Sequence, residues 1–117
     1  MSAVLVKALF TAVDVLELDV NDVATLLATS AKSVRRYRAD VATARLHRDQ
    51  VERMTLVIGI YESLRDIFGG NPIAIEWLRR PNRIFGDRAP LDRLRGGSIR
   101  DLIDVQHYLA ANDGGVW

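Results

Sequence analysis

The chain has 117 residues, of which 49% are hydrophobic and 26% are charged. This length fits one compact domain or two packed subdomains, and the composition excludes wholesale disorder. Sixteen basic and fifteen acidic residues give a net charge of +1, so the chain as a whole is not a polybasic nucleic-acid binder. Cysteine is absent, which excludes disulfides and cysteine–zinc sites and favours a reducing cytosol.

Neither a signal peptide nor a membrane span is expected. The first residues lack a basic region followed by a long apolar run and a small-residue cleavage site. No apolar stretch approaches the roughly 18 to 20 residues that a membrane span needs. We therefore expect a cytoplasmic protein.

The spacing of apolar residues predicts an all-α chain. In its first part, apolar residues recur at intervals of three and four, as on one face of a helix. Asn21 is expected to cap the second helix and Ser30 the third. The predicted helices span residues 4–16, 22–28 and 31–38, and residues 41–44 form a linker or a frayed helical turn.

A long helix is expected from about Leu46 to Phe68. Its apolar positions cover more than one face, so it should contact both the neighbouring subdomain and something else, and we expect it to help build a dimer. Glycines 69 and 70 end this helix.

The rest of the chain is expected to consist of short helices. Asn71 is predicted to cap a helix that begins with Pro72. A helical turn follows Pro90 with two leucines inward, and Ser98 caps a last helix to about residue 111. The residues expected to be buried by the helix after Asn71 are Ile73, Ile75, Trp77 and Leu78.

The second and third helices fit a helix-turn-helix unit. Residues 30–50 contain six basic and two acidic residues, whereas residues 11–29 contain four acids and no base. This segregation suits DNA binding, because basic side chains neutralise phosphates and arginine can bind guanine. The alternative is a solvated basic helix that packs on acidic neighbours. The candidate DNA-binding residues are Lys32, Ser33, Arg35, Arg36 and Arg38, and the inner face is formed by Val23, Leu27, Val34 and Tyr37.

The second half is rich in arginine, with seven arginines and no lysine across residues 79–100. Arginine is favoured at interfaces, although a solvated face is the alternative. The chain ends with two glycines, Val116 and Trp117, and tryptophan is a common anchor in interfaces. The alternative for this end is a frayed tail with Trp117 folded back. The candidate partner-binding residues are Arg79, Arg80, Arg83, Arg88, Arg93, Val116 and Trp117.

Residues 77–94 are the most informative stretch, with a Pro-Asn elbow and a second turn that ends at Pro90. The segment resembles the signature of the toxin-binding domain of Xre/MbcA/ParS-type antitoxins. The helix-turn-helix half resembles the Xre-like N-terminal half of the same family. The matching positions in the second half are Phe68-Gly69, Trp77-Leu78, Pro81-Asn82, Phe85-Gly86, Pro90, Leu94 and Gly96-Gly97.

This resemblance implies a helix-turn-helix subdomain over residues 1–44, followed by the long helix and a helical toxin-binding subdomain over residues 45–117. It implies the antitoxin of a type II toxin–antitoxin module, whose partner is usually a RES-domain toxin that consumes NAD. The antitoxin would occlude the active site of that toxin, and the complex would repress its own operator. It would act as a homodimer within a larger complex, and the partner-binding residues above would contact the toxin.

Catalytic chemistry is not indicated. The two histidines, His47 and His107, have no spacing that favours a nucleophile–base pair, and no glycine loop carries the lysine of a P-loop. We therefore expect no enzyme activity, no metal site and no cofactor. Two alternatives to the antitoxin remain: a stand-alone helix-turn-helix regulator without a toxin partner, and a dimerisation module whose basic face is incidental.

Overall fold

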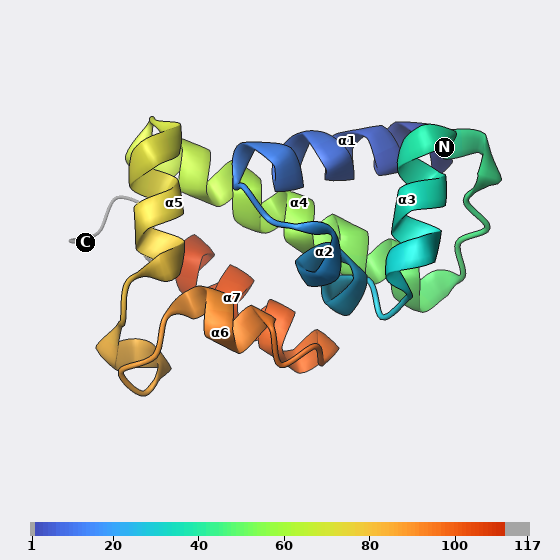
Figure 1. The fold of residues 1–117 in the computed structure, drawn as a ribbon. Helices are drawn as coiled ribbons and strands as arrows, with labels where there is room; N and C mark the ends of the chain where they lie inside the picture. Colours follow the sequence, from blue (N-terminus) through green and yellow to red (C-terminus); the bar gives the residue numbers. More distant parts are fainter. Residues whose placement is uncertain (1, 112–117) are drawn as a thin grey trace.

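The helices of this chain are arranged around one long central helix (Figure 1). The computed structural model describes residues 2–111, and in them it confirms the expected all-α class. None of the helices in this range has both the length and the apolar content to cross a bilayer. The elements are α1 (Ser2–Val15), α2 (Val20–Leu26), α3 (Ala31–Ala39), η1 (Val41–Thr43), α4 (Arg48–Phe68), α5 (Asn71–Arg79), η2 (Arg83–Phe85), α6 (Pro90–Leu94) and α7 (Ile99–Ala111).

The hydrophobic core is built around the central helix α4. It packs against α1 and α7 along its length, against α5 near its C-terminal end and against α2 (Figure 1). Its apolar stripe is buried on several sides, which explains why its apolar positions are spread over more than one face. The fully buried side chains include Leu9 and Val13 of α1, Met54, Ile60 and Leu64 of α4, and Leu102 and Leu109 of α7.

The start of α2 differs from the prediction. Asp19, not Asn21, is the N-cap: its Oδ1 accepts a hydrogen bond from the backbone N of Asp22 at 2.8 Å. The Oδ2 of Asp22 accepts one from the backbone N of Asp19 at 3.4 Å. In this reciprocal capping box, the two aspartate side chains accept hydrogen bonds from two backbone N–H groups at the start of the helix. If Asn21 were the cap, the side chain of Asp19 would not accept such a bond.

Two further helix starts were predicted wrongly by one or two residues. Helix α4 begins at Arg48 with His47 as its N-cap, and α5 already includes Asn71, with Gly70 as its N-cap. The buried face of α5 consists of Ala74, Trp77 and Leu78 at helical spacing. Ile73 lies on another face and is 53% exposed, so its predicted burial is wrong.

An aromatic cluster closes the far end of the core around Trp77. The Trp77 ring stacks on Tyr108 of α7 with ring centroids 6.3 Å apart, and it meets Phe85 edge-on at 6.3 Å. Phe68, at the end of α4, lies 6.2 Å from the same ring. Aromatic pairs at these separations add to the burial of their large apolar surfaces. The cluster therefore attaches α5 and the loop after it to α4 and α7.

A buried arginine joins three parts of the chain at the other end of α7. Arg53 of α4 is 8% exposed, and its Nη1 donates to the backbone oxygens of Leu26 at 3.2 Å and of Gly97 at 2.8 Å. Its Nε donates to Asp49 at 2.9 Å. Leu26 ends α2 and Gly97 precedes α7, so one guanidinium connects α2, α4 and the loop before α7.

Replacing Arg53 by alanine should destabilise the fold strongly. The change leaves two backbone carbonyls without this donor, and each buried polar group that loses its partner costs about 1–3 kcal/mol. We expect the free energy of unfolding to fall by about 2–4 kcal/mol in urea denaturation. Arg48→Ala is the matched control, because that side chain is 93% exposed, and it should change the same quantity by less than about 0.5 kcal/mol. Equal effects of the two variants would contradict the role of Arg53.

Candidate functional site

The basic surface at one end of the molecule is built on α3, the second helix of the helix-turn-helix unit. The Oγ of Ser30 caps α3 by accepting a hydrogen bond from the backbone N of Ser33 at 3.1 Å. Val34 and Tyr37 are buried in the core, which turns the rest of the helix toward solvent. The exposed basic residues on α3 that lie three and four positions apart are Lys32, Arg35 and Arg36.

Two of the five predicted DNA-binding residues are engaged inside the chain. Arg38 donates hydrogen bonds to both carboxylate oxygens of Asp14 on α1, at 2.9 and 2.8 Å, and its guanidinium lies 4.3 Å from the centre of the Phe10 ring. The hydrogen bond to Asp14 raises the pKa of Arg38 and outweighs its partial burial. The hydroxyl of Ser33 lies 3.1 Å from that of Ser30. Arg38 therefore attaches α3 to α1, whereas the contact of Ser33 stays within the start of α3. The other three side chains form the exposed group, in which the guanidinium of Arg36 lies 5.3 Å from the centre of the Tyr37 ring.

Two of the predicted toxin-binding arginines, both at the C-terminal end of α5, also have internal partners. Arg79 donates a hydrogen bond to the backbone oxygen of Glu17 at 2.9 Å, which ties α5 to the loop after α1. Arg80 pairs with Glu76 one turn earlier, at 3.0 Å, and both side chains of this pair are more than half exposed. An exposed pair at this spacing contributes little to stability, so Arg80 remains available to a partner.

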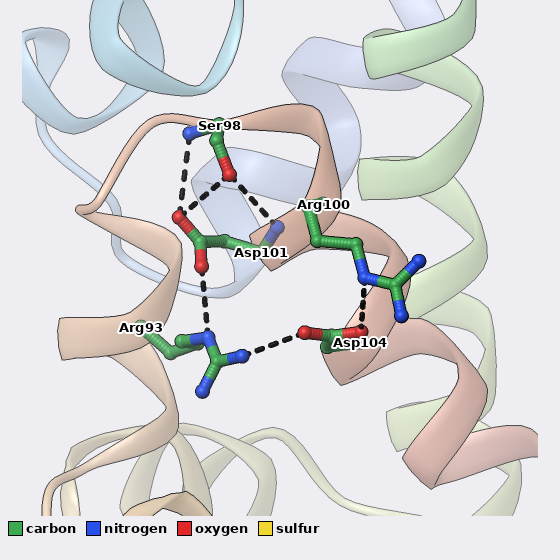
Figure 2. A network of polar contacts seen from close by, with 5 residues as sticks. All are labelled: Arg93, Ser98, Arg100, Asp101 and Asp104. Atoms are coloured by element: carbon green, nitrogen blue, oxygen red, sulfur yellow. Dashed lines mark hydrogen bonds and ion pairs between the residues drawn. The ribbon is translucent and has the colours of Figure 1, made fainter.

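A third predicted residue, Arg93 of α6, is the centre of a polar network (Figure 2). Its Nε lies 2.8 Å from Asp101 and its Nη2 lies 2.6 Å from Asp104, while Arg100 contacts Asp104 at 3.2 Å. The Oγ of Ser98 donates to Asp101 at 3.0 Å and accepts from the backbone N of Asp101 at 3.2 Å. Burial acts to raise the pKa of Asp101, but the hydrogen bonds from Ser98 and Arg93 outweigh it, so this pKa is lowered. The network fixes α6 against the start of α7.

The remaining two predicted arginines, Arg83 and Arg88, lie in the loop between α5 and α6. Both are exposed, and neither forms an ion pair within residues 2–111. Val116 and Trp117, also predicted to bind the toxin, lie outside the described residues. The predicted arginines therefore form two groups. Some make contacts that stabilise the fold, and others are available to bind a partner.

One ion pair that the sequence did not predict joins the two halves of the chain. The Nε of Arg95, just after α6, lies 2.8 Å from Oδ1 of the buried Asp22 on α2, and its Nη2 lies 3.3 Å from Oδ2. The hydrogen bond to Asp22 raises the pKa of Arg95. The two residues are 73 positions apart, and no local pattern marks them as partners. With Arg53, this pair fixes the helix-turn-helix unit against α6.

Metal chemistry has no apparent site in the part of the chain that the structure describes. Within residues 2–111, no group of three or more histidine, cysteine, aspartate or glutamate side chains is placed to hold a metal ion.

The fold and these surfaces define a class of protein: a helix-turn-helix unit with an exposed basic face, packed against a second helical half. Residues 1–59 match the family model of the antitoxin Xre-like helix-turn-helix domain. Residues 63–115 match that of the antitoxin Xre/MbcA/ParS C-terminal toxin-binding domain. The chain therefore belongs to the Xre/MbcA/ParS family of antitoxins, as the resemblance in its sequence indicated.

The chain is also similar to one curated protein and, in its fold, to one solved structure. The chain is 32% identical over 109 residues to the Uncharacterized protein y4oB of Sinorhizobium fredii (strain NBRC 101917 / NGR234), a match that covers 93% of this chain and 84% of that protein. Its fold is similar to that of a chain in the crystal structure of the M. tuberculosis MbcT–MbcA toxin–antitoxin complex. That match has a TM-score of 0.70 and 24% sequence identity and covers 97% of each chain.

The Arg93 network should make part of the stability dependent on pH. Because the pKa of Asp101 is lowered in the folded state, its contribution is complete above the ordinary carboxyl pKa of about 3.9 and is lost as the pH falls through the folded value. We expect Asp101→Asn to lower Tm at neutral pH and to weaken the decline of Tm below about pH 5, measured by circular dichroism. Asp66→Asn, whose side chain is 66% exposed, should keep the wild-type decline. Parallel curves for wild type and Asp101→Asn would contradict this assignment.

Proposed function

We propose that this antitoxin binds a RES-domain toxin that consumes NAD and neutralises it by covering its active site. The observation that carries the proposal is the match of residues 63–115 to the toxin-binding domain. The five predicted arginines of this half and the C-terminal residues Val116 and Trp117 are the proposed contacts. In this role the chain acts by binding and does not catalyse a reaction.

We further propose that the helix-turn-helix unit binds operator DNA and represses the gene of the antitoxin itself. The support is the exposed face of α3, where Lys32, Arg35 and Arg36 lie together without an ion pair in the described chain. Such residues at the recognition helix can reach phosphates and base edges in the major groove. Arg38 contributes indirectly, because its pair with Asp14 orients α3. Because both proposed partners are cytoplasmic, the proposed function belongs in the cytoplasm.

The proposed acting unit is a homodimer within a larger toxin–antitoxin complex. An apolar groove between α4 and α7 supports this proposal. It is lined by Val51, Glu52, Thr55 and Leu56 of α4 and by Ile99 and Ile103 of α7. A second copy of the chain would remove these apolar side chains from water, which is the main favourable term in protein association.

The toxin proposal is tested by a growth assay with the gene that adjoins the antitoxin gene. Expression of the neighbour alone should arrest growth and deplete NAD, and co-expression of this chain should reverse both effects, because the active site is covered. Deletion of residues 114–117 should weaken the reversal if this tail contributes to the cover.

Two results would count against the toxin proposal. If the neighbour is harmless, or if its toxicity is unchanged by this chain, the chain does not neutralise it. A stand-alone helix-turn-helix regulator would then be the better account, and DNA binding by the chain alone would be its test.

The operator proposal predicts that DNA binding depends on three residues of α3. A triple variant, Lys32→Ala/Arg35→Ala/Arg36→Ala, should bind the DNA upstream of its own gene about tenfold more weakly or worse. The dependence of log affinity on log salt concentration should also flatten, by up to about one unit for each phosphate that the variant no longer neutralises. Gel shifts over a salt series measure both quantities.

A control with the same loss of charge separates location from net charge. Arg65→Ala/Arg80→Ala/Arg88→Ala removes three exposed cations that lie on α4, just after α5 and in the loop before α6, away from α3. It should keep wild-type affinity and salt dependence. If both triple variants lose affinity for DNA to the same extent, the exposed face of α3 is not the DNA-binding surface.

A further inference from the structure

The loop between α5 and α6 is held in one shape by its own hydrogen bonds. The Oδ1 of Asn82 accepts from the backbone N of Ile84 at 3.0 Å, and the backbone oxygen of Asn82 accepts from two further N–H groups of the loop, each at 3.0 Å. The backbone N of Asn82 donates to the oxygen of Arg88 at 3.1 Å, which closes the segment as an antiparallel bridge. We name this segment, Asn82–Arg88, the η2 loop.

The backbone at the tip of the η2 loop adopts an uncommon conformation. Gly86 and Asp87 both have positive φ angles, +69° and +63°. Glycine tolerates this region without cost, and aspartate is among the side chains that adopt it most readily. These two residues therefore let the chain reverse direction tightly. Together with the hydrogen bonds above, they fix the shape of the loop before a partner arrives.

The η2 loop is attached to the core by one aromatic side chain. Phe85 is buried, with its ring 5.5 Å from that of Tyr108 and 6.3 Å from that of Trp77, edge-on in both cases. Its neighbour Ile84 is 60% exposed. The η2 loop thus buries Phe85 and leaves a large apolar side chain exposed to solvent.

Two unpaired arginines flank this exposed isoleucine. Arg83 precedes Ile84, and Arg88 closes the loop, and neither forms an ion pair within residues 2–111. By contrast, Arg79, Arg80 and Arg93 have partners on this chain. A partner carboxylate can therefore bind Arg83 and Arg88 without first breaking an internal contact.

We propose that the η2 loop is the main anchor through which this antitoxin holds its toxin. Ile84 fills an apolar pocket on the toxin, and carboxylates at the rim of that pocket pair with Arg83 and Arg88. The inference rests on the proposed function, since it takes the toxin as the partner. Beyond the proposed function, the inference names the residue at the centre of the interface with the toxin. It also names the chemistry of the toxin surface that this residue contacts.

The chemistry of the loop fits such a pocket. Interface energy concentrates in a few central side chains that fill well-packed pockets, and arginine is enriched around them. A loop fixed before binding loses little conformational entropy, which favours affinity. Planar guanidinium groups bind carboxylates through two parallel hydrogen bonds, which sets the orientation of the partner.

Nucleic acid fits the η2 loop less well. An exposed isoleucine gains nothing from contact with phosphates, and Asp87 lies between the two arginines in the sequence and opposes a phosphate. Helix α3, which carries the exposed basic group, lies at the opposite end of the molecule (Figure 1). The η2 loop is therefore assigned to a protein partner.

The test is the affinity of the full-length antitoxin for the toxin encoded by the adjoining gene, measured by isothermal titration with wild type as reference. Ile84→Asp should weaken binding roughly 30-fold or more, because it places a charge in an apolar pocket. The double variant Arg83→Ala/Arg88→Ala should weaken binding about tenfold and reduce the salt dependence of the affinity. Because these side chains are exposed, all variants should keep the wild-type Tm.

Ile73→Asp is the matched control, because Ile73 is of the same type, lies in the same half and is 53% exposed. It should bind the toxin within about threefold of wild type. If Ile84→Asp binds the toxin as tightly as wild type, the η2 loop is not the main anchor. The same conclusion follows if Ile73→Asp and Ile84→Asp lose equal affinity for the toxin. Neither result would contradict the proposal that the chain binds a toxin. Failure of the wild-type chain to bind the toxin would overturn both the anchor and the toxin proposal. Loss of DNA binding or of dimers by Ile84→Asp, with toxin affinity intact, would assign the loop to another partner and overturn the inference.

Discussion

The relative placement of the two halves depends on how the buried guanidinium of Arg53 is satisfied. Removing an arginine from water costs several kcal/mol unless its donors are bonded. Its partners are the backbone oxygens of Leu26 and Gly97, which belong to different halves, and Asp49 of its own helix. The contact with Asp49 lies within α4, but the two contacts with backbone oxygens form together only when the end of α2 and the loop before α7 both approach α4. A buried polar group of this kind selects one docking geometry, which apolar packing alone specifies less sharply.

The fixed geometry determines what the antitoxin can present to its partners. The pair between Arg95 and Asp22 adds a second polar contact between the halves, so the helix-turn-helix unit and α6 form one body. The exposed face of α3 and the η2 loop lie at opposite ends of a molecule 41 Å long (Figure 1). A macromolecule bound at one end leaves the other uncovered. The surfaces proposed to bind toxin and DNA are therefore separate parts of the chain.

Local features of the fold were predictable from the sequence, and long-range polar contacts were not. Apolar spacing predicted the all-α class, and the Ser30 cap and the burial of Val34 and Tyr37 followed from residues a few positions apart. The exposure of Ile73 could not be predicted, because it depends on which face of α5 meets the core. The internal partner of Arg38 was equally hidden, since Asp14 lies 24 positions away and approaches only in the folded chain.

The arginine-rich second half shows how tertiary structure distinguishes residues that composition treats as equivalent. An arginine that is paired on its own chain must break that pair before it binds elsewhere, so part of the new interaction energy is lost. Arg93, with two internal carboxylates, carries this penalty, whereas Arg83 and Arg88 have no ion pair to break within residues 2–111. The surface open to recognition is therefore set by which charges folding leaves unpaired, together with the apolar side chain exposed between them. Ile84 meets that condition because it is 60% exposed while its neighbour Phe85 is buried, and no signal in the sequence shows which of these two apolar side chains faces the core.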